Sequence, residues 1–217
     1  MSESVGTIPS WYRVTPAAER AQVEAAVGER LARQLAETTL VVLDVDGVLT
    51  SGDLLYGARG ETLKAFNAKD GLGLILARTV GIKRAVLTGR RSDIVARRTG
   101  ELHFDIVKMG RFDKAEALRE ILAESDSLPE RTLYMGDDLI DMAAMEQVGL
   151  AVTVPEAPAV VREACGYVTT AAGGRGAVRE VMDLLLMSRG MLGEALGRLG
   201  DPRWRPTAKD LSTDETG

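Results

Sequence analysis

The sequence contains one cysteine, one histidine and few aromatic residues. Cys165 has no partner for an intramolecular disulfide, and its small, apolar neighbours favour a buried structural thiol. We therefore expect a protein of a reducing, cytoplasmic compartment. His103 is the sole histidine, so phosphohistidine chemistry is disfavoured, and we expect a structural or solvent-facing role for this residue.

Long hydrophobic runs and basic clusters are also lacking. No run approaches the roughly 18 apolar residues of a membrane-spanning helix. Residues 1–13 do not show the basic segment and apolar core of a secretion signal. The net charge is −5 and Lys and Arg are spread throughout, so no basic stripe could follow a phosphate backbone. We expect neither a membrane nor a nucleic acid as a partner.

The sequence does contain a regular alternation of short apolar runs and amphipathic segments, within the composition of an ordinary globular protein. This pattern predicts an α/β fold, a doubly wound parallel sheet with helices on both faces. A small β-hairpin is predicted around the glycines of residues 54–66. The predicted strands are 39–43, 84–87, 105–107, 132–135, 150–153 and 167–168.

The chain is predicted to divide into an N-terminal arm and helix (1–37), a main domain (38–190) and a C-terminal tail (191–217), extended or disordered beyond about 200. One helix is expected over 15–36, because Thr15 can cap it and Pro16 suits its first position. Its apolar residues, which would pack against the domain or a neighbouring subunit, are Val23, Val27, Leu31 and Leu35.

Polar and charged residues follow several predicted strands at the point where each ends. In an open parallel sheet ligands bind outside these carboxyl ends, so the residues there should converge. Asp44 and Asp46 follow the first strand, and Asp137 follows a later one within the acidic run 136–141. Between them in the sequence come a hydroxyl and turn, Thr88-Gly89-Arg90, and a cation at a helix start, Lys114.

Each group has a plainer reading by itself: a solvated loop, an ordinary turn, an exposed lysine or a helix cap. Together they form the set that phosphoryl transfer requires. Carboxylates can share Mg²⁺, and one carboxylate oxygen can attack phosphorus to give an aspartyl-phosphate. The hydroxyl, the backbone amides and Lys114 would neutralise the phosphoryl oxygens, while the second Asp of the pair, Asp46, would protonate the leaving oxygen.

These four segments, 44–50, 88–90, Lys114 and 136–141, resemble the motifs of haloacid dehalogenase superfamily phosphatases. More narrowly, residues 63–71 and 172–180 resemble the family of 3-deoxy-D-manno-octulosonate 8-phosphate phosphatases. The resemblance runs from about residue 40 to residue 194 and implies a Rossmann-like core.

The resemblance implies Asp44 as the nucleophile and Asp46 as the general acid and base. It implies Mg²⁺ bound by Asp44, the backbone carbonyl of Asp46 and Asp137. Thr88, Gly89 and Lys114 would bind phosphate. The residues implied to hold the sugar acid are Asn67, Lys69, Asp70 and Arg90. Lys69 stands where many relatives have Arg, and an ammonium does not bind a carboxylate bidentately, which leaves the substrate preference open.

The spacing of the motifs leaves no room for a cap domain. Residues 47–87 are used by the hairpin and one helix, and residues 89–113 by one helix and one strand. A capless enzyme must exclude water in another way, for which a neighbouring subunit is suited. The resemblance implies a homotetramer joined through the hairpins. The hairpin's apolar side chains would be buried there or against their own domain; they are Leu54, Leu55, Tyr56 and Leu63.

The leading hypothesis is a Mg²⁺-dependent phosphatase that acts on the 8-phosphate of an eight-carbon sugar acid, 3-deoxy-D-manno-octulosonate, and releases the free acid and phosphate for lipopolysaccharide synthesis. A nine-carbon, sialic-type acid 9-phosphate remains an alternative substrate. A catalytically idle regulatory module is a further alternative, although retention of both Asp44 and Asp46 weighs against it. A signalling receiver domain would need an Asp after the strand at 105–107, where the sequence has Val107-Lys108-Met109.

Overall fold

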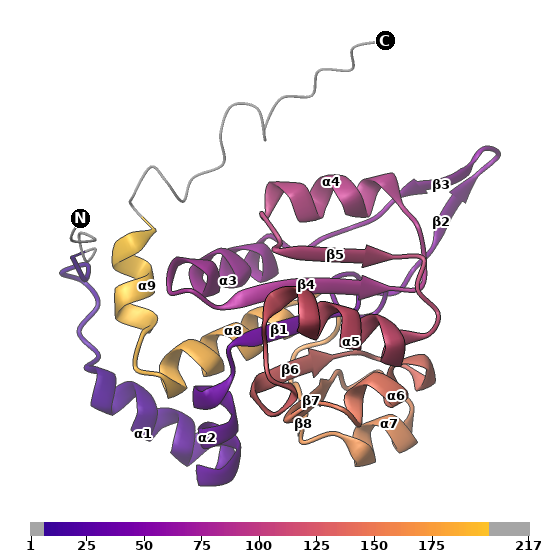
Figure 1. Ribbon diagram of the computed structural model, residues 1–217. Helices are drawn as coiled ribbons and strands as arrows, with labels where there is room; N and C mark the ends of the chain where they lie inside the picture. The colour runs from indigo at the N-terminus through magenta and orange to yellow at the C-terminus, as the bar shows by residue number, and fades with distance from the viewer. Residues whose placement is uncertain (1–6, 200–217) are drawn as a thin grey trace.

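The structure, a computed structural model, describes residues 7–199 and is built on a six-stranded parallel sheet (Figure 1). Every neighbouring pair of strands in it is parallel. In spatial order the strands are β5 (Ile106–Met109), β4 (Lys83–Thr88), β1 (Leu40–Leu43), β6 (Thr132–Met135), β7 (Leu150–Thr153) and β8 (Tyr167–Val168). The predicted doubly wound sheet is confirmed.

Strand β1 lies inside this sheet, between β4 and β6, and all four of its aliphatic side chains are fully buried. Such a strand is stable only with layers on both faces. In register, Leu40 pairs with Lys83 of β4 and Thr132 of β6. The strand order reverses here, since the chain next builds β4 and β5 on one side and later β6 to β8 on the other. The carboxyl end of β1 therefore lies at the switch point where such sheets bind ligands.

Helices cover both faces, as predicted (Figure 1). On one face α3 packs against α8 and β4, and on the other α5 packs against β4 and β5. The helices of the main domain are α3 (Ala68–Thr79), α4 (Asp93–Glu101), α5 (Lys114–Ser125), α6 (Met142–Met145), α7 (Ala159–Ala164) and α8 (Ala177–Ser188), with 3₁₀ turns at Pro129–Arg131 and Leu139–Asp141.

The single helix predicted over 15–36 is wrong in one respect, because two helices occupy this segment. They are α1 (Pro16–Val27) and α2 (Glu29–Glu37), separated by Gly28 with φ 82° and ψ 155°. The predicted cap is present, since the Thr15 hydroxyl accepts from the Ala18 N–H at 3.2 Å. Both helices pack on α8, and their apolar side chains join the core of the main domain, so the stripe packs against its own chain.

Part of the segment predicted as a tail is helical. Helix α9 (Leu192–Arg198) packs beside α3 and α8 (Figure 1). The buried Glu19 of α1 accepts the backbone N–H groups of Leu192 and Gly193, each at 3.1 Å. This pair of hydrogen bonds, here called the α1–α9 latch, ties the two ends of the described chain together. The expectations for residues 1–6 and 200–217 lie outside the described residues.

The predicted hairpin is confirmed as β2 (Leu55–Gly57) and β3 (Gly60–Leu63), which pair antiparallel and project from the sheet (Figure 1). Its apolar side chains stay largely exposed, at 44–64%; they are Leu54, Leu55, Tyr56 and Leu63. Only the hairpin and α3 separate β1 from β4, and only α4 and β5 separate β4 from α5. The fold is therefore capless over the described residues, as predicted.

Two further expectations concern single residues. Cys165 is partly buried and its Sγ lies 3.9 Å from Met145 Sδ, while burial raises the pKa of the thiol to about 11. His103 follows α4 with φ 52°, and its carbonyl accepts from the Arg84 guanidinium at 2.5 Å.

Among residues 7–199, no helix has both the length and the apolar character needed to cross a bilayer.

Candidate active site

The turn that follows β1 carries the first acidic pair. The Asp44 N–H donates to the Met135 carbonyl at 2.9 Å, which keeps Asp44 in line with the sheet, and the Asp44 side chain is buried. The chain then turns sharply at Gly47, whose φ is 85°. A Cβ at Gly47 would lie 2.0 Å from Asp137 Oδ2, so glycine is needed both for the turn and for the approach of Asp137.

Three carboxylates converge at the carboxyl ends of β1 and β6. Asp44, Asp137 and Asp141 each place an oxygen within 4.8 Å of the others. The buried ammonium of Lys114 lies 2.9 Å from Asp44 Oδ1 and 2.6 Å from Asp141 Oδ1. One ammonium against three carboxylates leaves an excess of two negative charges, the amount that one divalent cation neutralises. We call Asp44, Asp137, Asp141 and Lys114 the acidic cluster.

The pKa values in the cluster show the same shortage of positive charge. Burial raises the pKa of Asp44 to about 6, with Lys114 opposing and Asp141 adding to the shift. Burial, followed by the charges of Asp44 and Asp141, raises the pKa of Asp137 to about 7. Burial would lower the pKa of Lys114, but the two carboxylates beside it outweigh burial and raise it.

The donor set of the cluster fits a hard divalent cation. Asp44 Oδ1 is buried, and its polar contact is the ion pair with Lys114 at 2.9 Å. The same ammonium also serves Asp141, so it cannot balance all three buried carboxylates, and their excess charge costs free energy unless another cation reaches them. Oxygen-only ligands are those that Mg²⁺ prefers. The residues present therefore suit Mg²⁺.

Asp141 is a member of the cluster that the sequence analysis did not assign. Its side chain is fully buried, and Oδ1 accepts from Lys114 and from the Tyr134 hydroxyl at 2.8 Å. Oδ2 accepts the backbone N–H groups of Asp137 and Asp138, at 3.1 and 3.3 Å. Asp141 thus holds the turn that carries Asp137. The available signal was its place at the end of the acidic run 136–141.

Asp46 lies apart from the acidic cluster. Its side chain turns toward the hairpin, where Lys64 contacts Oδ1 and the Arg90 Nε lies 3.7 Å from Oδ2. The acidic side chains that could share a metal are accordingly those of Asp44, Asp137 and Asp141. The predicted metal contact through the Asp46 backbone carbonyl stays a prediction.

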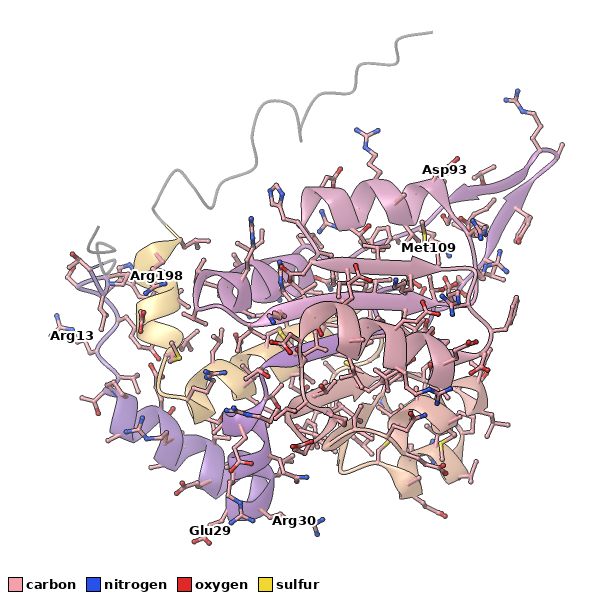
Figure 2. All side chains as sticks on the ribbon, viewed as in Figure 1. Arg13, Glu29, Arg30, Asp93, Met109 and Arg198 are labelled. Carbon is pink, nitrogen blue, oxygen red and sulfur yellow. The ribbon has the colours of Figure 1, made fainter. Side chains whose placement is uncertain are left out.

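A cavity of about 290 Å³ opens at this edge of the sheet, close to the carboxyl end of β5 marked by Met109 in Figure 2. It brings together the predicted catalytic and phosphate-binding residues with Arg90. Its lining includes Asp44, Asp46, Thr88, Gly89, Arg90, Lys114 and Asp137. Thr88 is buried and its hydroxyl accepts the Arg90 N–H at 3.3 Å, which fixes the turn after β4.

The other three predicted substrate residues do not line this cavity. Asp70 is buried, and its two oxygens accept the N–H groups of Gly176 at 3.3 Å and Arg179 at 2.8 Å. Asp70 is therefore occupied in capping α8. Asn67 caps α3 by accepting the Lys69 N–H at 2.8 Å, and Lys69 is exposed.

The glycine-rich segment before α8 supports the turn after β1. The Gly174 N–H donates to the Val48 carbonyl at 2.9 Å. A Cβ at Gly173 would lie only 1.7 Å from the Gly47 carbonyl oxygen. These backbone contacts explain why glycine occupies both positions. Arg175, in the same segment, lines a second cavity of about 220 Å³ that shares Asp137 with the first.

A capless doubly wound sheet with this acidic cluster at its switch point defines the haloacid dehalogenase class of hydrolases. The family model described as haloacid dehalogenase-like hydrolase matches residues 82–182. Among relatives, 3-deoxy-D-manno-octulosonate 8-phosphate phosphatase KdsC of Escherichia coli K12 is 46% identical over 159 residues, which are 73% of this chain and 85% of the relative. The chain belongs to the family of 3-deoxy-D-manno-octulosonate 8-phosphate phosphatases.

Solved structures agree with this assignment. The crystal structure of the Yersinia pestis phosphatase of that name gives a TM-score of 0.74 at 41% identity, over 76% of this chain and 89% of its own. The Moraxella catarrhalis phosphatase, crystallised with a magnesium ion, a phosphate ion and a KDO molecule, gives 0.71 at 36% identity, over 73% of this chain and 91% of its own.

Proposed function

We propose that this protein is a Mg²⁺-dependent phosphatase that hydrolyses 3-deoxy-D-manno-octulosonate 8-phosphate to the free sugar acid and phosphate, in support of lipopolysaccharide synthesis. The observation that carries the proposal is the acidic cluster, with two negative charges in excess beside a buried lysine at the switch point of the sheet. The names of relatives 42–46% identical to the chain support the substrate.

In the first half of the reaction an oxygen of Asp44 attacks phosphorus, and the bond from phosphorus to the sugar oxygen breaks. Asp46, as a carboxylic acid, gives its proton to that oxygen as it leaves. The products of this step are the free sugar acid, an aspartyl-phosphate on Asp44 and an ionised Asp46. Thr88, the Gly89 amide and Lys114 neutralise the phosphoryl oxygens, because all three line the same cavity.

In the second half a water oxygen attacks phosphorus, and Asp46 takes a proton from that water molecule. The bond from phosphorus to Asp44 breaks, so phosphate leaves and Asp44 is again a carboxylate. Mg²⁺, held by Asp44 and Asp137, would neutralise charge on the phosphoryl group in both halves. Asp141 and Lys114 orient these two carboxylates through the contacts described above.

The sugar-acid end of the substrate would lie at the open side of the cavity. Arg90 is the predicted sugar-acid residue that lines it, and its guanidinium can bind a carboxylate bidentately. A nine-carbon acid 9-phosphate would present the same phosphoryl group, so the catalytic residues serve both substrates.

The exposed hairpin supports a homotetramer. Four apolar side chains around a two-stranded sheet are 44–64% exposed, an arrangement that favours burial by another subunit. A neighbour placed there would also cover the strand-end cavity, which has no cap. We further propose a cytoplasmic location. Light scattering at micromolar concentration tests the assembly, and a fully active monomer would exclude it.

The direct test is phosphate release by the purified protein, with and without Mg²⁺. The panel contains 3-deoxy-D-manno-octulosonate 8-phosphate, nine-carbon acid 9-phosphates and simple sugar phosphates. We expect metal-dependent release chiefly from the eight-carbon acid. Asp44→Asn should abolish turnover and retain the fold, and appreciable residual activity would remove Asp44 as the nucleophile. Release from a nine-carbon acid alone would change the substrate but not the mechanism.

A further inference from the structure

Lys64 has no role in the reaction described above, yet it is among the most buried charged residues near the cavity. It follows β3 at the base of the hairpin, and its side chain is 1% exposed. Its ammonium contacts Asp46 Oδ1 and lies 3.0 Å from Glu61 Oε1. Burying an ammonium is costly unless carboxylates compensate it, so this placement is stable only because of these two partners.

Lys64 belongs to a neutral network that joins the hairpin to the strand ends. The network contains two carboxylates, Asp46 and Glu61, and two cations, Lys64 and Arg90. The Ser92 hydroxyl donates to Glu61 Oε2 at 2.5 Å, and Arg90 contacts the Tyr56 hydroxyl. Residues from β2, from β3 and its end, and from the segments after β1 and β4 thus meet around Asp46.

The network holds Asp46 from two sides. Lys64 contacts one carboxylate oxygen, and Arg90 Nε lies 3.7 Å from the other. The Asp46 side chain is 20% exposed and still lines the cavity. Asp44, two residues earlier, is held by Lys114 instead. Each Asp of the pair therefore has its own lysine, and these lysines come from different elements.

We propose that Lys64 is a positioning residue that fixes the side chain of Asp46 at the phosphoryl site, where Asp46 acts first as an acid and then as a carboxylate base, and that makes this placement depend on the hairpin. The proposal rests on the proposed function for the role of Asp46. A general acid or base contributes about 10²–10⁴ in rate, and a displacement of about 1 Å can remove about 10² of it. Loss of Lys64 should thus affect the chemical step more than substrate or metal binding.

The test is Lys64→Met, which keeps the length of the side chain and removes its charge. We expect kcat to fall about 10- to 100-fold, while KM and the Mg²⁺ concentration for half-maximal activity change by less than about threefold. Lys64→Arg should restore part of kcat, because its guanidinium can contact Asp46. If Lys64→Met does not fold, Lys64→Gln supplies the measurement, since it keeps an N–H donor and removes the charge.

The matched control is Lys108→Met. Lys108 also pairs with two carboxylates, Glu124 at 2.8 Å and Glu120 at 3.7 Å, but does not line the cavity. Its kcat should equal that of the wild type. A fall as large as that of Lys64→Met would show a general effect of losing a lysine.

The decisive readout is a double-mutant cycle with Asp46→Asn, measured by phosphate release from 3-deoxy-D-manno-octulosonate 8-phosphate at high enzyme concentration, because its alkoxide leaving group needs the proton from Asp46. If Lys64 acts through Asp46, adding Lys64→Met to Asp46→Asn lowers kcat by less than about twofold. Independent, multiplicative losses would overturn the proposal, as would a raised KM with unchanged kcat. Failure of the proposed function is a separate outcome, because the wild type would then release no phosphate from any substrate.

Discussion

Replacing Asp141 with Asn tests whether this residue holds the acidic cluster together. The amide keeps the shape of the carboxylate but offers one acceptor and one donor. Its oxygen must face the N–H groups of Asp137 and Asp138, because an NH₂ there would meet two donors. The NH₂ then faces Lys114 and Tyr134. The tyrosine hydroxyl can accept from it, but the ammonium cannot.

The expected cost follows from these contacts. Breaking a buried ion pair costs about 3–5 kcal/mol, and Lys114 keeps its second partner, Asp44, which favours the lower end. Without metal, the lost charge also relieves repulsion, since Asp141 raises the pKa values of Asp44 and Asp137. We therefore expect Asp141→Asn to lower the free energy of unfolding by about 2–3 kcal/mol at pH 7 in the presence of a chelator.

Urea unfolding followed by circular dichroism measures this change. Asp138→Asn is the matched control, because the same chemical change is made three residues away at an exposed N-cap, where Asn and Asp are equivalent. The control should change the free energy of unfolding by less than about 0.5 kcal/mol. The reasoning is refuted if Asp141→Asn costs less than about 1 kcal/mol, or if both variants lose the same amount.

Two further predictions concern the same edge of the sheet. Asp44 and Asp137 have folded pKa values of about 6 and 7, above the ordinary 3.8, so their contribution to the stability of the metal-free protein is largest below about pH 4. That contribution should fall by about 3 kcal/mol as the pH rises from about 4 through the two folded pKa values. Mg²⁺ or Asp137→Asn should reduce this loss, and identical pH profiles of Asp137→Asn and the wild type without metal would contradict it. Gly173→Ala should lower both the free energy of unfolding and kcat, because its Cβ would meet the Gly47 carbonyl oxygen. The control is Gly100→Ala in α4, where a Cβ has open space. This variant should raise the free energy of unfolding by up to about 1 kcal/mol. Thermal unfolding and phosphate release check this pair, and equal behaviour of the two variants would count against the contact.

The sheet and the convergence of the residues at its strand ends were predictable because they depend on local patterns. The strand at 132–135 and the strand at 150–153 have the predicted bounds, since apolar runs flanked by polar residues mark their own ends. The residues after β1, β4 and β6 converge because parallel strands end at one edge. Gly28 was not predicted to break a helix, because an isolated glycine is often tolerated in one.

Two contacts that the sequence does not reveal join distant parts of the chain. Asp70 was assigned to the substrate, but it caps α8 through N–H groups 106 and 109 residues later. Nothing in the local sequence distinguishes such a cap from a ligand. Lys64 was missed for the same reason, since its partner Asp46 lies 18 residues earlier across the hairpin. Its one local signal was a charge between apolar neighbours, Leu63 and Ala65.

The α1–α9 latch has a consequence for the order in which the protein folds. Glu19 joins backbone groups 173 and 174 residues away, so nearly the whole described chain must be in place before these bonds can close. Contacts of such separation are expected to form late and to open early. Helices α1 and α9 should then detach as one cooperative unit, and amide hydrogen exchange in the two should proceed at similar rates while the central sheet stays protected.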